Sequence, residues 1–136
     1  MTLIRAEFAP AFYYGDDVVL LAMDRAGVNE FARELQSAEA HGSAELEHNG
    51  TTHQIVIVQH QADIQLEDTL VVWRLDPDKA REILSYLRDL SAGEGQQPCH
   101  QYVDIRKPAD MLILSRDEYV DRVARPSPER WIRGCR

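Results

Sequence analysis

The chain has 136 residues, with 15 basic and 23 acidic side chains and a formal net charge of -8. A chain of this length buries enough surface for one hydrophobic core but not for two. Its longest apolar run, Val18–Met23, is far too short to span a membrane. Arg5 and Glu7 interrupt the N-terminal apolar residues, so we expect no secretory signal either.

The charge is divided unequally along the chain. Residues 121–136 carry five arginines against two acidic residues, a local charge of +3, which leaves -11 on residues 1–120. We therefore expect a single α+β domain over 1–120 and an Arg-rich C-terminal tail over 121–136. The tail either packs back on the domain or serves as a docking arm. The acidic body argues against nucleic-acid and membrane partners and favours a basic protein partner.

The cysteine content favours a cytoplasmic protein. The two cysteines, Cys99 and Cys135, are too few and too far apart for a disulfide framework or a thiolate metal site. We expect both thiols to be reduced, as is usual in the cytoplasm.

The first part of the chain predicts two strands and a helix. Residues 2–8 alternate loosely and predict a strand that ends at Pro10. Val18–Met23 is apolar on both faces, which is typical of a central strand. Asp24 is a suitable N-cap, and helical spacing of apolar residues predicts an amphipathic helix over about residues 25–38.

A hairpin follows this helix, which Gly42 ends. Ala44–His48 and Thr51–Gln59 flank the dipeptide Asn49-Gly50. Both positions of a two-residue type I′ turn need positive φ, which Asn tolerates and Gly adopts freely. The dipeptide therefore predicts a tight β-hairpin.

The second part predicts a strand pair and a second helix. One strand begins near Ile64 and another covers Thr69–Leu75. Asp76 and Pro77 are typical of an N-cap and of the first helical position. The helix buries one apolar stripe and ends at Gly93; the stripe consists of Ala80, Ile83, Leu84, Leu87 and Leu90.

Two further strands, Cys99–Ile105 and Met111–Ser115, complete the predicted elements. We therefore expect an α+β fold built as a single two-layer sandwich. In it, a mostly antiparallel sheet of about six to eight strands carries two helices on one face.

The sequence also contains a weak internal similarity. A shift of 52 places superimposes Val18–Leu35 on Leu70–Leu87, with identical residues at Val19/Val71, Asp24/Asp76, Glu30/Glu82 and Leu35/Leu87. One interpretation is a repeat of strand, capped helix and strand. The other, which the sequence favours, is that any two capped amphipathic helices after strands match this well.

Motifs for common chemistry are missing. Asp24 and Asp76 place carboxylates at the two helix starts, where a phosphate needs bare N–H groups. Neither Gly-x-Ser-x-Gly nor His-Glu-x-x-His occurs. We expect no catalytic residues and no cofactor.

Four of the five histidines fall within twenty residues, so a metal site has to be weighed. If the hairpin pairs as expected, His53 lies opposite Leu46, which is two positions from His48 on the neighbouring strand. These two histidines, together with Glu45 or Glu47, would make at best a weak zinc site. The spacing favours solvated hairpin histidines instead, and we predict no metal.

Two segments carry candidate functional side chains. Strand periodicity places His100, Tyr102 and Asp104 on one face. That face is open to three interpretations: a polar outer surface, a recognition surface, or a site for acid–base catalysis by the imidazole. The second segment places Tyr13 and Tyr14 beside Asp16 and Asp17.

Exposed tyrosines flanked by carboxylates suit protein recognition, because Tyr gives a large contact area and Asp attracts basic residues. Further acidic residues share the same negative character: Glu45, Glu47, Asp63, Glu67 and Asp68. We include all of these among the candidate partner-binding residues.

The order of elements resembles that of small bacterial immunity proteins of polymorphic-toxin and contact-dependent inhibition systems. The segments that carry the resemblance are Val18–Leu35, the strand His100–Asp104 and the closing segment Met111–Tyr119. The resemblance implies a non-enzymatic, cytosolic, often acidic domain that masks the active site of a cognate toxin, frequently a nuclease.

We therefore expect a non-enzymatic, acidic protein-binding module that neutralises a basic cognate toxin. One alternative is a small enzyme or small-ligand-binding protein that uses His100, Tyr102 and Asp104. Another is a structural homo-oligomer, such as a homodimer, that buries an apolar sheet face or Trp131 between copies.

Overall fold

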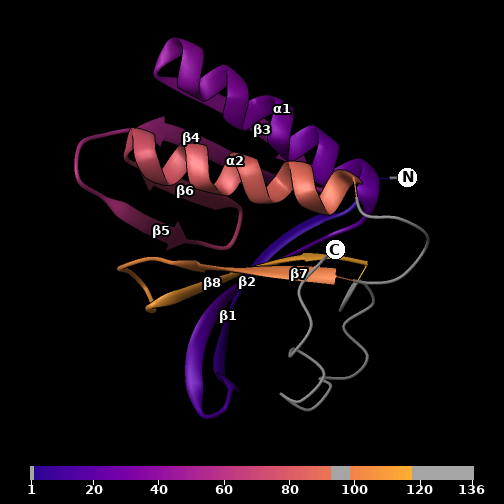
Figure 1. Cartoon of the computed structure of the whole chain (residues 1–136), viewed down its shortest axis with the longest axis vertical. Helices are drawn as coiled ribbons and strands as arrows, with labels where there is room; N and C mark the ends of the chain where they lie inside the picture. The colour runs from indigo at the N-terminus through magenta and orange to yellow at the C-terminus, as the bar shows by residue number, and fades with distance from the viewer. Residues whose placement is uncertain (1, 93–98, 118–136) are drawn as a thin grey trace.

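The structure is a computed structural model that describes residues 2–92 and 99–117 (Figure 1). Over these residues the chain forms eight strands and two helices. The strands are β1 (Ile4–Tyr13), β2 (Asp16–Met23), β3 (Ser43–His48), β4 (Thr51–Ile57), β5 (Ala62–Leu66), β6 (Leu70–Leu75), β7 (Cys99–Asp104) and β8 (Met111–Arg116). The helices are α1 (Arg25–His41) and α2 (Pro77–Ala92).

The strands form two mixed four-stranded sheets. The first sheet has the order β1-β2-β8-β7 and the second the order β3-β4-β6-β5. Each sheet consists of two antiparallel hairpins joined by one parallel pair, β2 with β8 and β4 with β6. The α+β class and the number of strands are confirmed, but the expected single sheet is wrong. Each half of the chain places one hairpin in each sheet, and local sequence patterns do not specify which hairpins pair.

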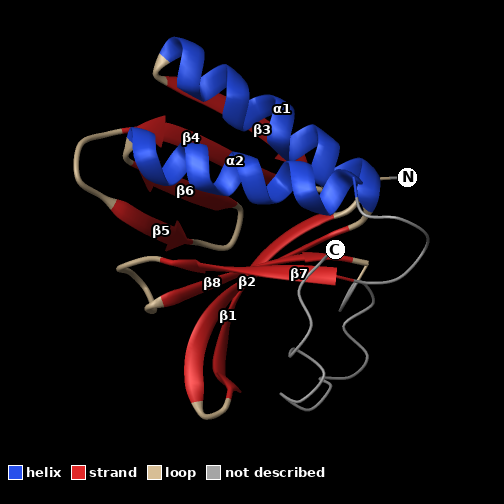
Figure 2. Cartoon of the chain, in the orientation of Figure 1, coloured by secondary structure: helices blue, strands red, loops and turns tan. Residues whose placement is uncertain are grey.

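The same connectivity occurs twice. Each half runs strand, strand, helix, strand, strand, and exchanging β1–β4 for β5–β8 converts the order of one sheet into that of the other. The two helices lie side by side, and the β1–β2 hairpin projects from the opposite end of the molecule (Figures 1 and 2).

Equivalent backbone hydrogen bonds support this repeat. The N–H of Asp24 donates to the carbonyl of Leu3 at 3.3 Å, and that of Asp76 donates to the carbonyl of Gln61 at 2.8 Å. A second pair of bonds matches in the same way. The N–H of the residue after β4 donates to the last carbonyl of β6 at 2.9 Å, and the N–H of the residue after β8 donates to the last carbonyl of β2 at 2.7 Å. Two unrelated capped helices would not share these bonds, so the topology supports an internal repeat rather than coincidence.

Both helices begin at the predicted caps. The Oδ1 atoms of Asp24 and Asp76 accept from the N–H groups of Gly27 and Lys79, each at 2.7 Å. The first helix runs three residues beyond the predicted end, because Gly42 at φ 94° forms a left-handed C-cap whose N–H donates to the carbonyl of Ala38. Gly93 lies outside the described residues.

The first strand does not end at Pro10. Pro10 lies inside β1, an edge strand, where the missing N–H removes no interior ladder bond. The pairing register shifts between Ala9 and Tyr13, and Ala11 takes a positive φ of 50°. The N–H of Ala11 donates instead to Oδ1 of Asp17 at 2.8 Å.

The main core lies between the helices and the two sheets and draws on both halves of the chain. Trp73 and Phe31 are its largest aromatic members, and the whole predicted stripe of α2 is buried. A second, smaller cluster lies on the first sheet and consists of Ala9, Phe12, Val18, Leu20 and Ile113. Within the described residues, neither helix combines the length and the apolar character needed to cross a membrane.

The expectation that both cysteines are reduced is wrong for Cys99, which is disulfide-bonded. Cys135 and the Arg-rich tail over 121–136 lie outside the described residues.

The close approach of α1 to the start of β1 gives a sharp test of the fold. A Cβ atom on Gly27 would lie 1.9 Å from the carbonyl oxygen of Leu3. Helix propensity alone predicts that Gly27→Ala stabilises the protein by about 1 kcal/mol. The contact predicts the opposite, a loss of about 3 kcal/mol, because the overlapping atom is backbone. Urea unfolding measures the difference, and a raised midpoint would contradict the packing described.

Candidate functional site

Three tyrosines, two from the β1–β2 hairpin and one from β7, form an aromatic cluster at the tip of this hairpin. The rings of Tyr13 and Tyr14 meet edge-to-face with centroids 4.8 Å apart. The ring of Tyr13 also lies 5.3 Å from that of Tyr102. Because β1 and β7 are the two edges of the first sheet, the hairpin tip reaches across this sheet. We call Tyr13, Tyr14 and Tyr102 the tyrosine cluster.

The cluster has a rigid base. Tyr13 and Tyr102 pack against the second hydrophobic cluster, whose members Val18, Leu20 and Ile113 are almost completely buried. A tyrosine held from below in this way loses little side-chain entropy when its outer face is covered.

Tyr14 occupies a backbone conformation that its side chain disfavours. Tyr13 pairs with Asp16 across a two-residue turn, and Tyr14 and Gly15 take φ values of 50° and 89°. Such turns normally place Asn, Asp or Gly at the first position, because a larger side chain strains the left-handed region. Tyr14 is also 58% exposed. The local stability of the turn therefore does not explain why a tyrosine is there.

The β3–β4 hairpin provides an internal comparison. Its turn has the same pair of positive φ angles, 50° at Asn49 and 80° at Gly50. There the favoured dipeptide is present. The same fold thus uses the favoured residue in one turn and an exposed aromatic in the other.

Exposed carboxylates lie on the same two segments as the tyrosine cluster, the β1–β2 hairpin and β7. Asp16, Asp17 and Asp104 are all exposed. Asp17 also has a structural role, since it accepts the hydrogen bond from Ala11 described above. Phe8, 40% exposed on the same hairpin, is a further apolar side chain that the sequence alone did not single out.

The strand face of His100, Tyr102 and Asp104 is divided between the interior and the surface. His100 is only 2% exposed, and its Nε2 lies 3.1 Å from the hydroxyl of Tyr102. Asp104 lies at the other end of β7, opposite Met111. His100 therefore positions Tyr102, which is half-buried, and only Asp104 of the three is exposed.

The remaining acidic candidates lie in the second sheet or beside it. Glu45 and Glu47 are exposed on the edge strand β3. Asp63 is half-buried on β5, where its Oδ1 has no hydrogen-bond partner. Glu67 and Asp68 lie in the turn between β5 and β6. Of the twelve predicted residues, the structure therefore places four on the β1–β2 hairpin and three on β7, which the ring contact between Tyr13 and Tyr102 joins, and it places the other five in or beside the second sheet.

His53 differs most from the sequence-based interpretation. The predicted pairing with Leu46 is confirmed, but His53 is completely buried rather than solvated. Its Nδ1 accepts a hydrogen bond from Nε1 of Trp73 at 3.2 Å, and its ring packs edge-on against Phe31. The sequence did contain a signal for this burial, because side chains alternate along a strand and His53 therefore shares a face with the core residue Ile55.

Burial lowers the pKa of His53 from 6.5 to about 4, with a smaller contribution from the nearby His48. The Nε2 atoms of both imidazoles are buried without a hydrogen-bond partner. Within the described residues, no three potential ligands come close enough to hold a metal ion.

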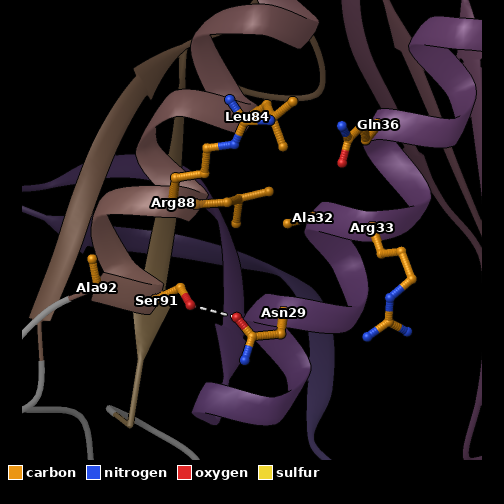
Figure 3. Close-up of a pocket in the computed structure, with 9 residues that line it drawn as sticks. Asn29, Ala32, Arg33, Gln36, Leu84, Arg88, Ser91 and Ala92 are labelled. Atoms are coloured by element: carbon orange, nitrogen blue, oxygen red, sulfur yellow. Dashed lines mark hydrogen bonds between the residues drawn. The ribbon is translucent and has the colours of Figure 1, made fainter.

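The structure contains a cavity beside His48 and His53 and a groove between the two helices. A cavity of about 270 Å³ is lined by the start of β1, the β3–β4 hairpin and the β5–β6 turn, and it includes His48 and His53. A groove of about 330 Å³ separates α1 from α2, with Arg33 and Arg88 on opposite walls (Figure 3). The hydroxyl of Ser91 donates to Oδ1 of Asn29 at one end of this groove.

Comparisons with known proteins assign no family. No protein-family model matches the chain, and no curated protein matches its sequence. The crystal structure of Drosophila Suppressor of Fused is similar over 76% of this chain, with 9% sequence identity and a TM-score of 0.46. The chain covers 24% of that protein chain. A likeness of this level identifies neither the family nor the function.

The lowered pKa of His53 predicts a pH-dependent stability. The unfolded chain protonates this group near pH 6.5 and the folded chain only near pH 4. The free energy of unfolding is therefore unaffected above pH 6.5 and falls by about 3 kcal/mol as the pH decreases to 4. His53→Gln removes this contribution. Urea unfolding at both pH values should show a smaller loss in the variant, and equal losses would contradict the assignment.

Proposed function

We propose that this protein is an acidic protein-binding module that docks a basic partner on the β1–β2 hairpin. The docking surface consists of the tyrosine cluster and its exposed neighbours Asp16 and Asp104. The observation that carries the proposal is Tyr14, an exposed aromatic residue in a turn conformation that favours Asn or Gly.

The energetics of Tyr14 support a role in binding. Holding a residue of this kind in the left-handed region costs about 1–2 kcal/mol. The edge-to-face contact with Tyr13 contributes about 0.5–1.5 kcal/mol in return. Folding therefore gains little from this side chain, whereas aromatic side chains near the centre of an interface often contribute 2 kcal/mol or more to binding.

The charge of the protein supports a basic partner. The body carries -11, and the aspartates beside the tyrosine cluster extend that charge to the docking surface. Opposite charges accelerate association, and charged neighbours around an aromatic centre fix its orientation. A second copy of this chain would bring like charges together at the hairpin, which disfavours a homodimer through this surface.

A toxin-neutralising immunity protein is the specific member of this class that we propose. Nuclease toxins bind a polyanion and are commonly basic, so an acidic module associates with them quickly. The activity needed is occlusion of a partner's active site, which requires no catalytic residue, cofactor or metal on this chain.

Reversing one charge beside the tyrosine cluster tests whether electrostatic attraction accelerates association with the partner. The partner is captured from cells that naturally express the protein, identified by mass spectrometry and purified. We expect Asp16→Lys to slow its association about 3- to 10-fold at low salt, with little effect near 0.5 M salt. Asp16 is preferred to Asp17, whose carboxylate also holds the hairpin.

The matched control is Glu39→Lys, which makes the same change of charge at an exposed position on α1. We expect a clearly smaller effect on the association rate. Equal slowing by both variants, or a captured partner that is acidic, would contradict docking on the hairpin.

Replacing Tyr14 with Asn separates binding from folding. Relief of the left-handed strain offsets the lost ring contact, so the free energy of unfolding should change by less than about 1 kcal/mol. Affinity for the partner should fall about 30-fold or more. Calorimetry and urea unfolding measure the two quantities. Unchanged affinity would remove Tyr14 from the interface and with it the main support for the proposal.

A further inference from the structure

The first residue of β7 carries a covalent bond to another part of the chain. Cys99 is disulfide-bonded, and Cys135 in the Arg-rich tail is the only other cysteine. Cys135 is therefore the one partner that the chain offers for this bond. Across the first sheet, Cys99 lies opposite Arg116, the last residue of β8. A bond to Cys135 thus returns the tail to the end of the β7–β8 pair from which it starts.

The outer edge of β7 can accept a further strand. Among the described residues, β7 is an edge strand of the first sheet. Just beyond the β7–β8 pairing, the N–H of Ile105 donates to the carbonyl of Asp110 at 3.0 Å. Hydrogen bonding alternates along an antiparallel strand. The odd-numbered residues of β7 therefore direct their backbone groups toward β8, and the even-numbered residues direct theirs toward the outer edge.

Cys99 occupies a position that suits a disulfide to an antiparallel neighbour. For a strand added at the outer edge, the odd-numbered residues of β7 form the non-hydrogen-bonded pairs. At such pairs the Cα atoms lie about 4.5 Å apart, which is within the range of a disulfide. The bond also determines the register. With Cys135 opposite Cys99, each step back along the tail matches one step forward along β7.

This register brings compatible side chains together. The opposing pairs are Arg130 with Asp104, Trp131 with Val103, Ile132 with Tyr102, Arg133 with Gln101 and Gly134 with His100. The first pair joins opposite charges, the next two join apolar or aromatic side chains, and no pair opposes like charges. Opposing pairs of these kinds stabilise an antiparallel sheet. A parallel arrangement would direct the tail past the start of β7, where none of these pairs forms.

The tail is also long enough to take this position. Residue 130 would lie at the far end of β7, about 17 Å from Cys99. Residues 118–130 span about 40 Å when extended, so they reach this point easily. Pro126 and Pro128 precede the segment, so every N–H that the added strand needs is present.

We propose that Cys99 is bonded to Cys135 and that residues 130–135 form a fifth, antiparallel strand on β7. We call this segment the tail strand. It lies beside the tyrosine cluster, because Tyr102 belongs to that cluster and faces Ile132 in the tail strand. The pairing itself does not depend on the proposed protein partner.

The tail strand regulates the docking surface, a consequence that rests on the proposed function. With the disulfide closed, Arg130 neutralises Asp104, one of the carboxylates that attract the basic partner. A dithiol opens the bond by giving one hydrogen atom to each sulfur and becoming a disulfide itself. The tail strand then loses its fixed register, and the negative charge of Asp104 acts on the partner.

Two measurements on the full-length protein, purified without reductant, test the pairing. Mass spectrometry of the unreduced tryptic digest should show peptides linked through Cys99 and Cys135. NMR should show Hα–Hα contacts at the non-hydrogen-bonded pairs, between residues 101 and 133 and between residues 103 and 131. Free thiols, a bond between two copies of the chain, or contacts in another register would overturn the proposal.

Reversing the charge of Arg130 tests its pairing with Asp104. In Arg130→Glu two carboxylates oppose each other, so hydrogen exchange of the Tyr102 amide should accelerate about threefold to tenfold. The matched control, Arg122→Glu, makes the same change of charge outside the tail strand. We expect it to change the exchange rate less than about twofold. Equal acceleration by both variants would overturn the pairing.

Cys135→Ser separates the regulation from the docking function. It changes no residue of the described domain and releases the tail strand. Association of the captured partner should therefore accelerate about twofold to threefold at low salt. An unchanged rate would overturn regulation by the tail strand. Docking on the hairpin is tested independently by Asp16→Lys, so the two proposals can fail separately.

Discussion

The parallel pairing of β2 with β8 and of β4 with β6 ties the two halves of the chain together, because neither half completes a sheet by itself. These four central strands supply much of the buried core. Their partners β1, β7, β3 and β5 are the edges of the two sheets. The edge strands and the turns carry most of the candidate functional side chains; Asp16 and Asp17 at the start of β2 and His53 on β4 are the exceptions.

Two residues depart from what folding alone favours. Tyr14 is an exposed aromatic in a turn suited to Asn or Gly, and His53 places an unpartnered donor in the interior. Departures of this kind are expected at functional sites, where interactions with a ligand offset a local loss of stability. The two lie in different places, one at the projecting hairpin and the other between the sheets. They are therefore two separate features of the fold and do not form one extended surface.

The parts of the fold that depend on local sequence could be predicted. Asp24 and Asp76 cap their helices through bonds to residues three positions away, and Asn49-Gly50 determines its hairpin through two φ angles. The division into two sheets depends on which hairpin edges meet, and no local pattern encodes that choice. The burial of His53 follows from strand period, but the polarity of histidine suggested the surface.

For the candidate site, too, the sequence predicted the local segments but not how they meet in space. The sequence marked Tyr13 and Tyr14 as one recognition segment and Tyr102 as another, because residue types and strand period show local chemistry. Their contact depends on how the β1–β2 hairpin crosses the first sheet, which only the tertiary structure shows.

Photo-crosslinking in cells that naturally express the protein tests the central claim most directly. A benzophenone amino acid replaces Tyr14 in one variant and Glu39, on the exposed face of α1, in another. Docking on the hairpin predicts that position 14 yields one dominant crosslink to a basic protein and that position 39 yields none. Equal crosslinking at both positions, or a dominant crosslink only at position 39, would show that the partner binds elsewhere.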